Sequence, residues 1–122
     1  MKQLTQKEIN DIIIKHEIWL DDNNHEGSST NLSNMNLSHS NLSHSDLIGS
    51  NLNHSNLSYS DLSCSDLRGS NLSYSNLSCS CLNHCDFRDT DLDFSCWPLW
   101  CGGLNVKIDD RLAIQLLFHT IL

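Results

Sequence analysis

Residues 42–62 read LSHSDLIGSNLNHSNLSYSDL, and Leu occupies every fifth position of this stretch. The same spacing extends in both directions, from Thr30 to Phe94, without a missed position. A period of five is neither the 3.6 of a helix nor the 2 of a strand, so it predicts a chain that turns a corner in each unit. The central apolar residues of thirteen consecutive units are the predicted core: Leu32, Leu37, Leu42, Leu47, Leu52, Leu57, Leu62, Leu67, Leu72, Leu77, Leu82, Phe87 and Leu92.

Two further regularities accompany the central residue. The residue two positions before it is small in nearly every unit, with Met35 the largest variant, and the residue just before it is Asn or Asp, except Cys81. In addition, the segment 46–52 returns twenty residues later as 66–72, and again with changes as 86–92. An echo of twenty residues inside a repeat of five indicates stacked coils of four non-equivalent sides.

The unit Ser45-Asp46-Leu47-Ile48-Gly49 shows the motif plainly. It resembles the pentapeptide repeat family, whose unit is a small residue, Asp or Asn, Leu or Phe, and two variable residues. The resemblance implies an all-β fold, a right-handed quadrilateral β-solenoid in which the central residue and the small residue point inward. Gly49 and Gly69 end two units of one side, and because a type II turn needs positive φ at this position, we expect that side to turn differently from the others.

The chain leaves the repeat at both ends, which predicts short helical caps on the solenoid. Residues 1–29 are predicted to form an N-terminal cap, residues 30–94 the solenoid and residues 95–122 a C-terminal cap. Thr5 and Glu8 read as a capping box that starts a helix reaching about Lys15. Residues 16–20 are then expected to be a strand-like entry to the first coil.

At the other end, Trp97, Pro98 and Trp100 are expected to cover the last coil. Residues 105–108 alternate like a strand, and Asp109 is a plausible N-cap for a helix from 110 to about 119. The apolar residues of this helix either fold back against the tryptophans or bind a second copy of the chain. Because members of the family often dimerise through such segments, the resemblance favours a homodimer, whose face would be Leu112, Leu116, Ile121 and Leu122.

The sequence predicts no active site. Cys79, Cys81, His84 and Cys85 lie close together in the chain, but the repeat points Cys85 inward and Cys81 outward, so they are not expected to converge on a metal. Ser and His are too frequent for any nucleophile–base pair to be singled out. We therefore expect no metal, no cofactor and no enzymatic activity.

Charge limits the partners. The formal net charge of −8 opposes binding to nucleic acid and to anionic membranes. The first residues contain no apolar run, so neither a signal peptide nor a membrane anchor is expected, and the cytoplasm is the expected location. The thiols are then expected to be reduced.

A protein is therefore the expected partner, and the sequence is compatible with two hypotheses about how it binds. The first is an interaction scaffold that binds a protein partner through outward residues; the candidate surface is His54, Tyr74, Phe94, Tyr59, Asp86, Asp89, Asp91 and Asp93. The second follows from the resemblance, because some family members mimic DNA and bind DNA gyrase. Thirteen units give a rod about 16 Å tall, beside which a duplex of that length carries about nine or ten phosphates. The net repeat charge of −5 from seven Asp and two Arg is about half of that, which favours the scaffold.

Overall fold

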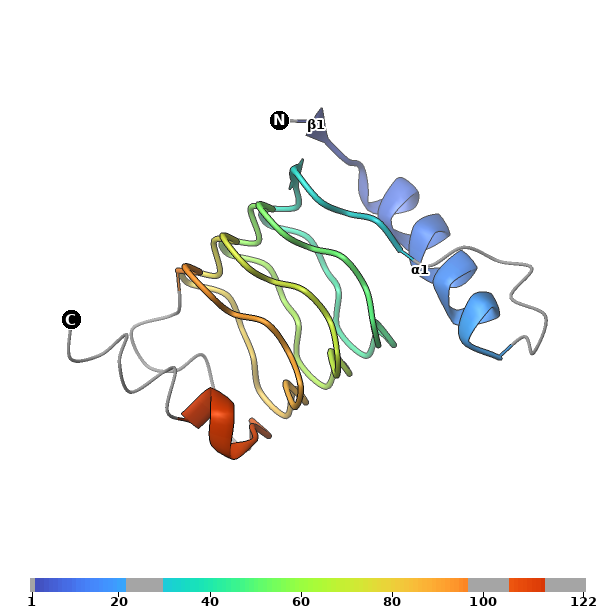
Figure 1. Ribbon diagram of the computed structural model, residues 1–122. Helices are drawn as coiled ribbons and strands as arrows, with labels where there is room; N and C mark the ends of the chain where they lie inside the picture. The colour runs from blue at the N-terminus through green and yellow to red at the C-terminus, as the bar shows by residue number, and fades with distance from the viewer. Residues whose placement is uncertain (1, 22–29, 97–105, 114–122) are drawn as a thin grey trace.

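The computed structural model describes residues 2–21, 30–96 and 106–113. Its regular elements are the strand β1 (Lys2–Gln3), the helix α1 (Gln6–Asp21) and the strand β2 (Met35–Asn36). Most of the chain lies in stacked coils, with α1 at the N-terminal end of the stack and residues 106–113 at the other end (Figure 1). No helix among these described residues has the length and hydrophobicity needed to cross a membrane.

The coils repeat every twenty residues. Parallel bridges join Asn31 to Asn51, Asn51 to Asn71 and so on through each row, and backbone bonds such as Leu52 N–H to the Asn71 carbonyl, 2.8 Å, hold neighbouring coils together. We name the four sides by their central residues: side A (32, 52, 72, 92), side B (37, 57, 77), side C (42, 62, 82) and side D (47, 67, 87). The β-solenoid with four units per coil is therefore present, and its right-handed winding and the capping role of its helical ends stay predictions.

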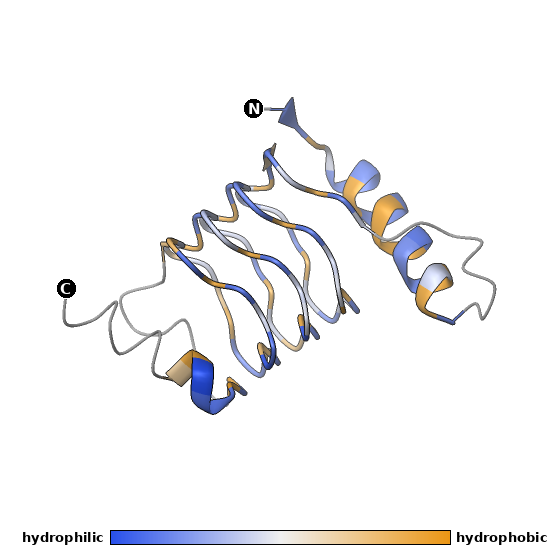
Figure 2. Ribbon diagram, viewed as in Figure 1, coloured by the Kyte–Doolittle hydropathy of each residue, from blue (hydrophilic) through white to orange (hydrophobic). Residues whose placement is uncertain are grey.

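The predicted core is confirmed. Every one of the thirteen central residues is at most 1 % exposed, and apolar and polar residues alternate along the coils (Figure 2). Burying a Leu side chain contributes about 2 kcal/mol before the loss of conformational entropy, so this column is the main source of stability.

Most of the small residues that point inward are Ser, and their buried hydroxyls donate hydrogen bonds to backbone carbonyls. Most donate to the central carbonyl three residues earlier, as Ser55 does to Leu52 at 2.6 Å. Ser65 instead reaches the Leu42 carbonyl of the coil before it, at 2.7 Å. Thr30 and Ser50 are the buried hydroxyls without a hydrogen-bond partner within the described segments.

The expectation that the glycine side turns differently was wrong. The last residue of every unit has φ between 57° and 69°, whether it is Gly69, His54, Tyr74 or Cys64. Most units also close with a bond from the residue after this position to the central carbonyl, as Ser70 N–H does to Leu67 at 3.1 Å. One turn therefore serves all four sides, and stacking between coils overrides the usual preference of this backbone conformation for Gly.

Helix α1 begins as predicted but runs further. Thr5 and Glu8 form the capping box: Glu8 N–H donates to Thr5 Oγ1, and Thr5 N–H to Glu8 Oε1, both at 3.2 Å. The predicted strand at residues 16–20 was wrong, because the helix continues to Asp21. Ile9, Ile13 and His16 are its buried residues, and their i, i+4, i+7 spacing extends one helical stripe through the imidazole.

The N-terminal segment supplies hydrogen-bond partners that a preceding coil would otherwise give. β1 pairs in parallel with β2, Lys2 opposite Met35 and Gln3 opposite Asn36. On side C, the Gln6 side-chain amide accepts from Asn41 N–H at 2.9 Å and donates to the Asn41 carbonyl at 2.7 Å. It thus stands in for a peptide group of the missing coil.

His16 supplies hydrogen-bond partners to the first coil on the remaining two sides, A and D. Thr30 N–H donates to its Nδ1 at 3.0 Å, so the proton sits on Nε2, which lies 2.8 Å from the Ile48 carbonyl and donates to it. The ring is fully buried and stacks on Trp19 with a centroid separation of 5.6 Å. A polar residue is therefore the link between α1 and the first coil.

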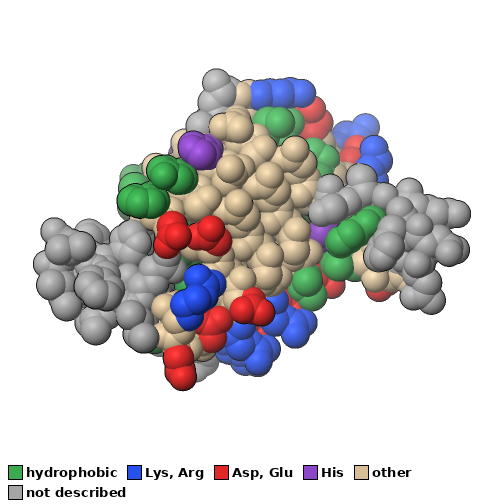
Figure 3. Space-filling view, viewed as in Figure 1, with side chains coloured by type: hydrophobic (Ala, Val, Ile, Leu, Met, Phe, Trp, Pro, Cys, Tyr) green, Lys and Arg blue, Asp and Glu red, His purple; other side chains and the backbone are tan. Residues whose placement is uncertain are grey.

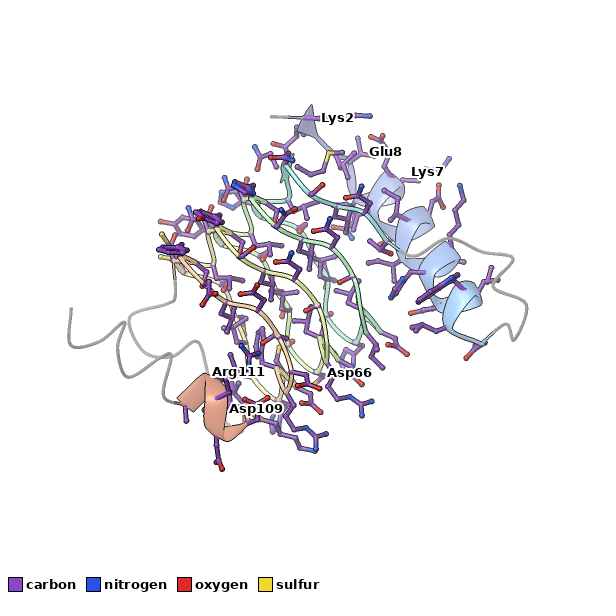
Figure 4. The ribbon with its side chains drawn as sticks, viewed as in Figure 1. Lys2, Lys7, Glu8, Asp66, Asp109 and Arg111 are labelled. Atoms are coloured by element: carbon purple, nitrogen blue, oxygen red, sulfur yellow. The ribbon has the colours of Figure 1, made fainter. Side chains whose placement is uncertain are left out.

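The C-terminal residues 106–113 extend the ladder on side D. Lys107 N–H donates to the Cys85 carbonyl, and Phe87 N–H donates to the Lys107 carbonyl, both at 2.8 Å. Asp109 caps the following helical turn through Leu112 N–H, at 2.9 Å, as predicted. Figure 4 shows Asp109 and Arg111 beside the last coil.

The predicted dimer face is corrected at Leu112. This residue is fully buried in the core cluster, so it cannot be an exposed contact for a second copy. Its position is explained by the end of the solenoid, whose last Leu needs an apolar cover. The other residues of that face and the predicted tryptophan cover lie outside the described residues: Trp97, Pro98, Trp100, Leu116, Ile121 and Leu122.

Candidate functional site

Aromatic rings stack along the corner between sides A and B. The rings of His54 and Tyr74 are 4.7 Å apart and inclined by 6°, and those of Tyr74 and Phe94 are 5.0 Å apart and inclined by 19°. These residues end successive side A units, so the coil spacing itself sets the stack. Tyr74 is 54 % and Phe94 72 % exposed. We call His54, Tyr74 and Phe94 the AB ladder; Figure 4 shows such a column of rings along one corner of the coils.

A second column follows the corner between sides B and C. His39 and Tyr59 stack at 5.1 Å with an inclination of 6°. Interaction with the neighbouring Cys79 thiol raises the pKa of Tyr59, and Tyr59 is 60 % exposed. We call His39, Tyr59 and Cys79 the BC ladder. The predicted surface residues Tyr59, Tyr74, His54 and Phe94 thus border the same side, side B.

The predicted acidic residues do not lie together. Asp86 and Asp89 belong to side D, whereas Asp91 and Asp93 belong to side A beside Phe94. Although these four residues are close in sequence, the chain turns a corner between Asp89 and Asp91, so the two pairs lie on different sides of the coil. The face seen in Figure 3 is mainly uncharged polar side chains and backbone, with charged groups towards its margins.

Side D carries a self-neutralising ion-pair ladder. Arg68 binds Asp66 through Nε to Oδ1 at 2.9 Å and Nη2 to Oδ2 at 2.7 Å, and Arg88 binds Asp86 at 2.9 and 2.6 Å in the same way. Arg68 Nε also lies 3.7 Å from Asp86 Oδ2 in the next coil. The bond from Arg88 holds the pKa of Asp86 below its ordinary value. This ladder was not predicted, although the twenty-residue echo already placed Arg88 above Arg68.

The cysteines follow the repeat rather than a metal site. Cys85 is buried, its thiol donates to the Leu62 carbonyl at 2.7 Å, and burial raises its pKa to about 12. Cys64, Cys79 and Cys96 are exposed. Over the described part of the chain, no three His, Cys, Asp or Glu side chains are arranged to hold a metal ion.

A groove of about 380 Å³ lies between α1 and side C of the first coil. Its helical wall contains the half-exposed Ile14 and the carboxylate of Glu17, and its coil wall contains His44. Sequence reasoning missed this groove because it depends on how the helix packs across the coil. The complete lining is Gln6, Asn10, Ile13, Ile14, Glu17, Asn41, Ser43, His44 and Ser45.

The repeat geometry agrees with a family comparison. The family model for pentapeptide repeats matches residues 28–63 and 50–89, in eight copies, which together span half of the chain. The chain belongs to the pentapeptide repeat family. No curated protein matches it.

Several solved structures are similar to the chain. QnrB1, described as a plasmid-mediated fluoroquinolone resistance protein, is 23 % identical over 74 % of this chain and 44 % of its own, with a TM-score of 0.43. The pentapeptide repeat protein alr5209 from Nostoc PCC 7120 is 15 % identical over 88 % and 98 %, with a TM-score of 0.43. Rfr23 from the cyanobacterium Cyanothece 51142 is 28 % identical over 68 % and 59 %, with a TM-score of 0.30. The chain spans less than half the length of QnrB1.

Proposed function

We propose that this chain is a non-enzymatic interaction scaffold that binds another protein through the AB ladder and the adjoining part of side A. The observation that carries the proposal is the AB ladder itself, in which two large aromatic side chains are more than half exposed. Aromatic residues are enriched at protein interfaces because they bury a large area at a small entropic cost. The stacked rings are already ordered, which lowers that cost further.

The acidic residues of side A add a preference to this surface. Asp91 and Asp93 precede Phe94 in the unit 90–94, which has no Lys or Arg of its own, so this end of side A is net acidic even with Arg111, which donates to the Thr90 carbonyl. A partner that presents basic groups beside an apolar patch fits this end of the ladder best. The proposal places the scaffold in the cytoplasm, where its exposed thiols stay reduced.

The second candidate is a DNA mimic that binds DNA gyrase, as some members of the pentapeptide repeat family do. Mimicry needs regularly spaced negative charge that is left uncompensated. On side D, which holds the longest column of acids, Asp66 and Asp86 are each paired with an arginine of their own unit. The scaffold is therefore the better proposal.

The scaffold is tested by capture from lysate followed by a binding measurement with the purified captured protein. The variant Tyr74→Ser/Phe94→Ser removes two rings of the AB ladder, and Cys64→Ser/His84→Ser changes the same position of two side C units. We expect the ladder variant to weaken binding at least about tenfold and the control to leave it within about twofold, because exposed aromatic anchors carry most interface energy. Equal effects of the two variants would refute the surface.

A gyrase supercoiling assay separates the second candidate. We expect no change in supercoiling at a large excess of the chain. Inhibition, or protection from a quinolone, at concentrations near that of gyrase would replace the scaffold proposal by the mimic.

A further inference from the structure

Side B differs from the other sides in charge. Its three described units, residues 35–39, 55–59 and 75–79, contain no Asp, Glu, Lys or Arg. Side A carries Asp91 and Asp93, side C carries Asp61, and side D carries the ion-pair ladder. Lys2, opposite Met35 through β1, lies at the N-terminal edge of side B. Side B is thus an uncharged strip on a chain of net charge −8.

On the floor of side B, the Asn side-chain oxygens are paired with the Ser two residues later in the same unit. Asn56 Oδ1 accepts from Ser58 N–H at 3.0 Å and from Ser58 Oγ at 2.7 Å. Asn76 and Ser78 repeat this arrangement at 3.0 and 2.7 Å in the next coil. These internal bonds lower the cost of removing water from the side-chain oxygens and the Ser hydroxyls, and the Asn Nδ2 groups are left as donors for a second copy of the chain.

The two borders of side B give it a fixed period. The AB ladder runs along one border with ring spacings of 4.7 and 5.0 Å, and the BC ladder runs along the other with a spacing of 5.1 Å. Rows with this spacing interdigitate along their whole length only with rows of the same spacing. A second copy of the chain has rows with the same spacing, because its sequence is identical.

We propose that side B is a self-association face, on which a second copy of this chain packs its own side B about a twofold axis. Charge favours this occupant, because two chains of net charge −8 repel each other least where neither carries charge. A twofold contact is closed, so it yields a dimer and not a fibre. The dimer leaves side A of both copies open but uses the AB ladder at its border, so a partner bound to the AB ladder would compete with it. The dimer rests on the proposed function only for the premise that the ladders bind protein.

Three coils give a face about 14 Å tall, which is small beside stable interfaces. We therefore expect a reversible dimer, visible by sedimentation equilibrium of the purified chain from micromolar to millimolar concentration. No hetero-partner takes part in this measurement, so its failure is distinct from a failure of the scaffold proposal.

The test uses two matched charge variants. Ser58→Asp places a carboxylate at the centre of side B, and Ser43→Asp places one at the same unit position on side C, where Ser43 bonds Asn41 as Ser58 bonds Asn56. Asp93 already occupies this position in another unit, so both variants should fold. We expect Ser58→Asp to weaken dimerisation at least about tenfold and Ser43→Asp to change it less than about twofold, because only the first brings like charges together in the interface.

A second variant and a salt series complete the test. Tyr59→Ser, which removes a border ring without adding charge, should also weaken the dimer. Added salt should strengthen the wild-type dimer, because it screens the net repulsion of the two chains. A wild-type chain that stays monomeric, equal effects of the two Asp variants, or a dimer weakened by salt would overturn the proposal.

Discussion

Cys85 illustrates how the repeat decides the chemistry of a single residue. It fills the inward position that Ser65 fills in the preceding coil and donates to the Leu62 carbonyl in the same manner. The sequence alone predicted this inward orientation, because position within the unit determines it. The sequence could not predict the altered acidity, which depends on how completely the neighbouring coils exclude water.

We predict that Cys85 resists thiol reagents in the folded chain. Its pKa, raised to about 12 by burial, keeps it protonated at pH 8, and its sulfur is inaccessible. Alkylation followed by peptide mass mapping should modify Cys64 and Cys79 and leave Cys85 unmodified until denaturant is added. Labelling of Cys85 at the rate of Cys64 in the native protein would contradict the buried assignment.

Helix α1 shows that hydrophobic periodicity alone does not predict where a helix ends. Its start was predictable because a capping box is a local signal. Its end was not, because His16 is polar and reads as a break in the apolar pattern. Only the packed structure shows that the imidazole sits between Thr30 N–H and the Ile48 carbonyl and thereby continues the buried stripe.

We predict that His16→Phe lowers the free energy of unfolding by about 1–3 kcal/mol, because it leaves a buried N–H and a carbonyl without partners. Urea unfolding measures the loss, and amide exchange should show faster exchange at Thr30. The control Lys15→Phe puts the same ring at an exposed helical position and should stay within about 0.5 kcal/mol of the wild type. An unchanged midpoint with a protected Thr30 amide would show that the link is dispensable.

The whole molecule behaves as a stack in which each coil contacts its neighbours through rows of identical position. The free energy of unfolding is then nearly a sum over coils and the contacts between neighbouring coils. Keeping the rows aligned between coils is therefore more important for folding than the number of coils. Leu above Leu and Ser above Ser are preserved whenever a complete turn is added or removed.

We predict that removing residues 50–69, one full coil, leaves a cooperative fold, because Gly49 is then followed by Ser70, Asn71 and Leu72 in the same phase. Removing only residues 50–52 should be far more damaging, because the shortened coil can no longer match its neighbours. Circular dichroism during thermal unfolding measures both. A three-residue deletion that unfolds at a higher temperature than the twenty-residue deletion would contradict the row model.

The sequence by itself determined the interior of this protein: which residues point inward and how many units form a coil. It could do so because a strict period of five leaves a single arrangement that buries every central Leu. The common turn on all four sides, the ion pairs of side D and the His16 link were decided only by the tertiary structure. The His16 link and the contact between Arg68 and Asp86 join residues 14 to 32 positions apart, which become neighbours only when the chain folds, and the common turn depends on stacking between coils.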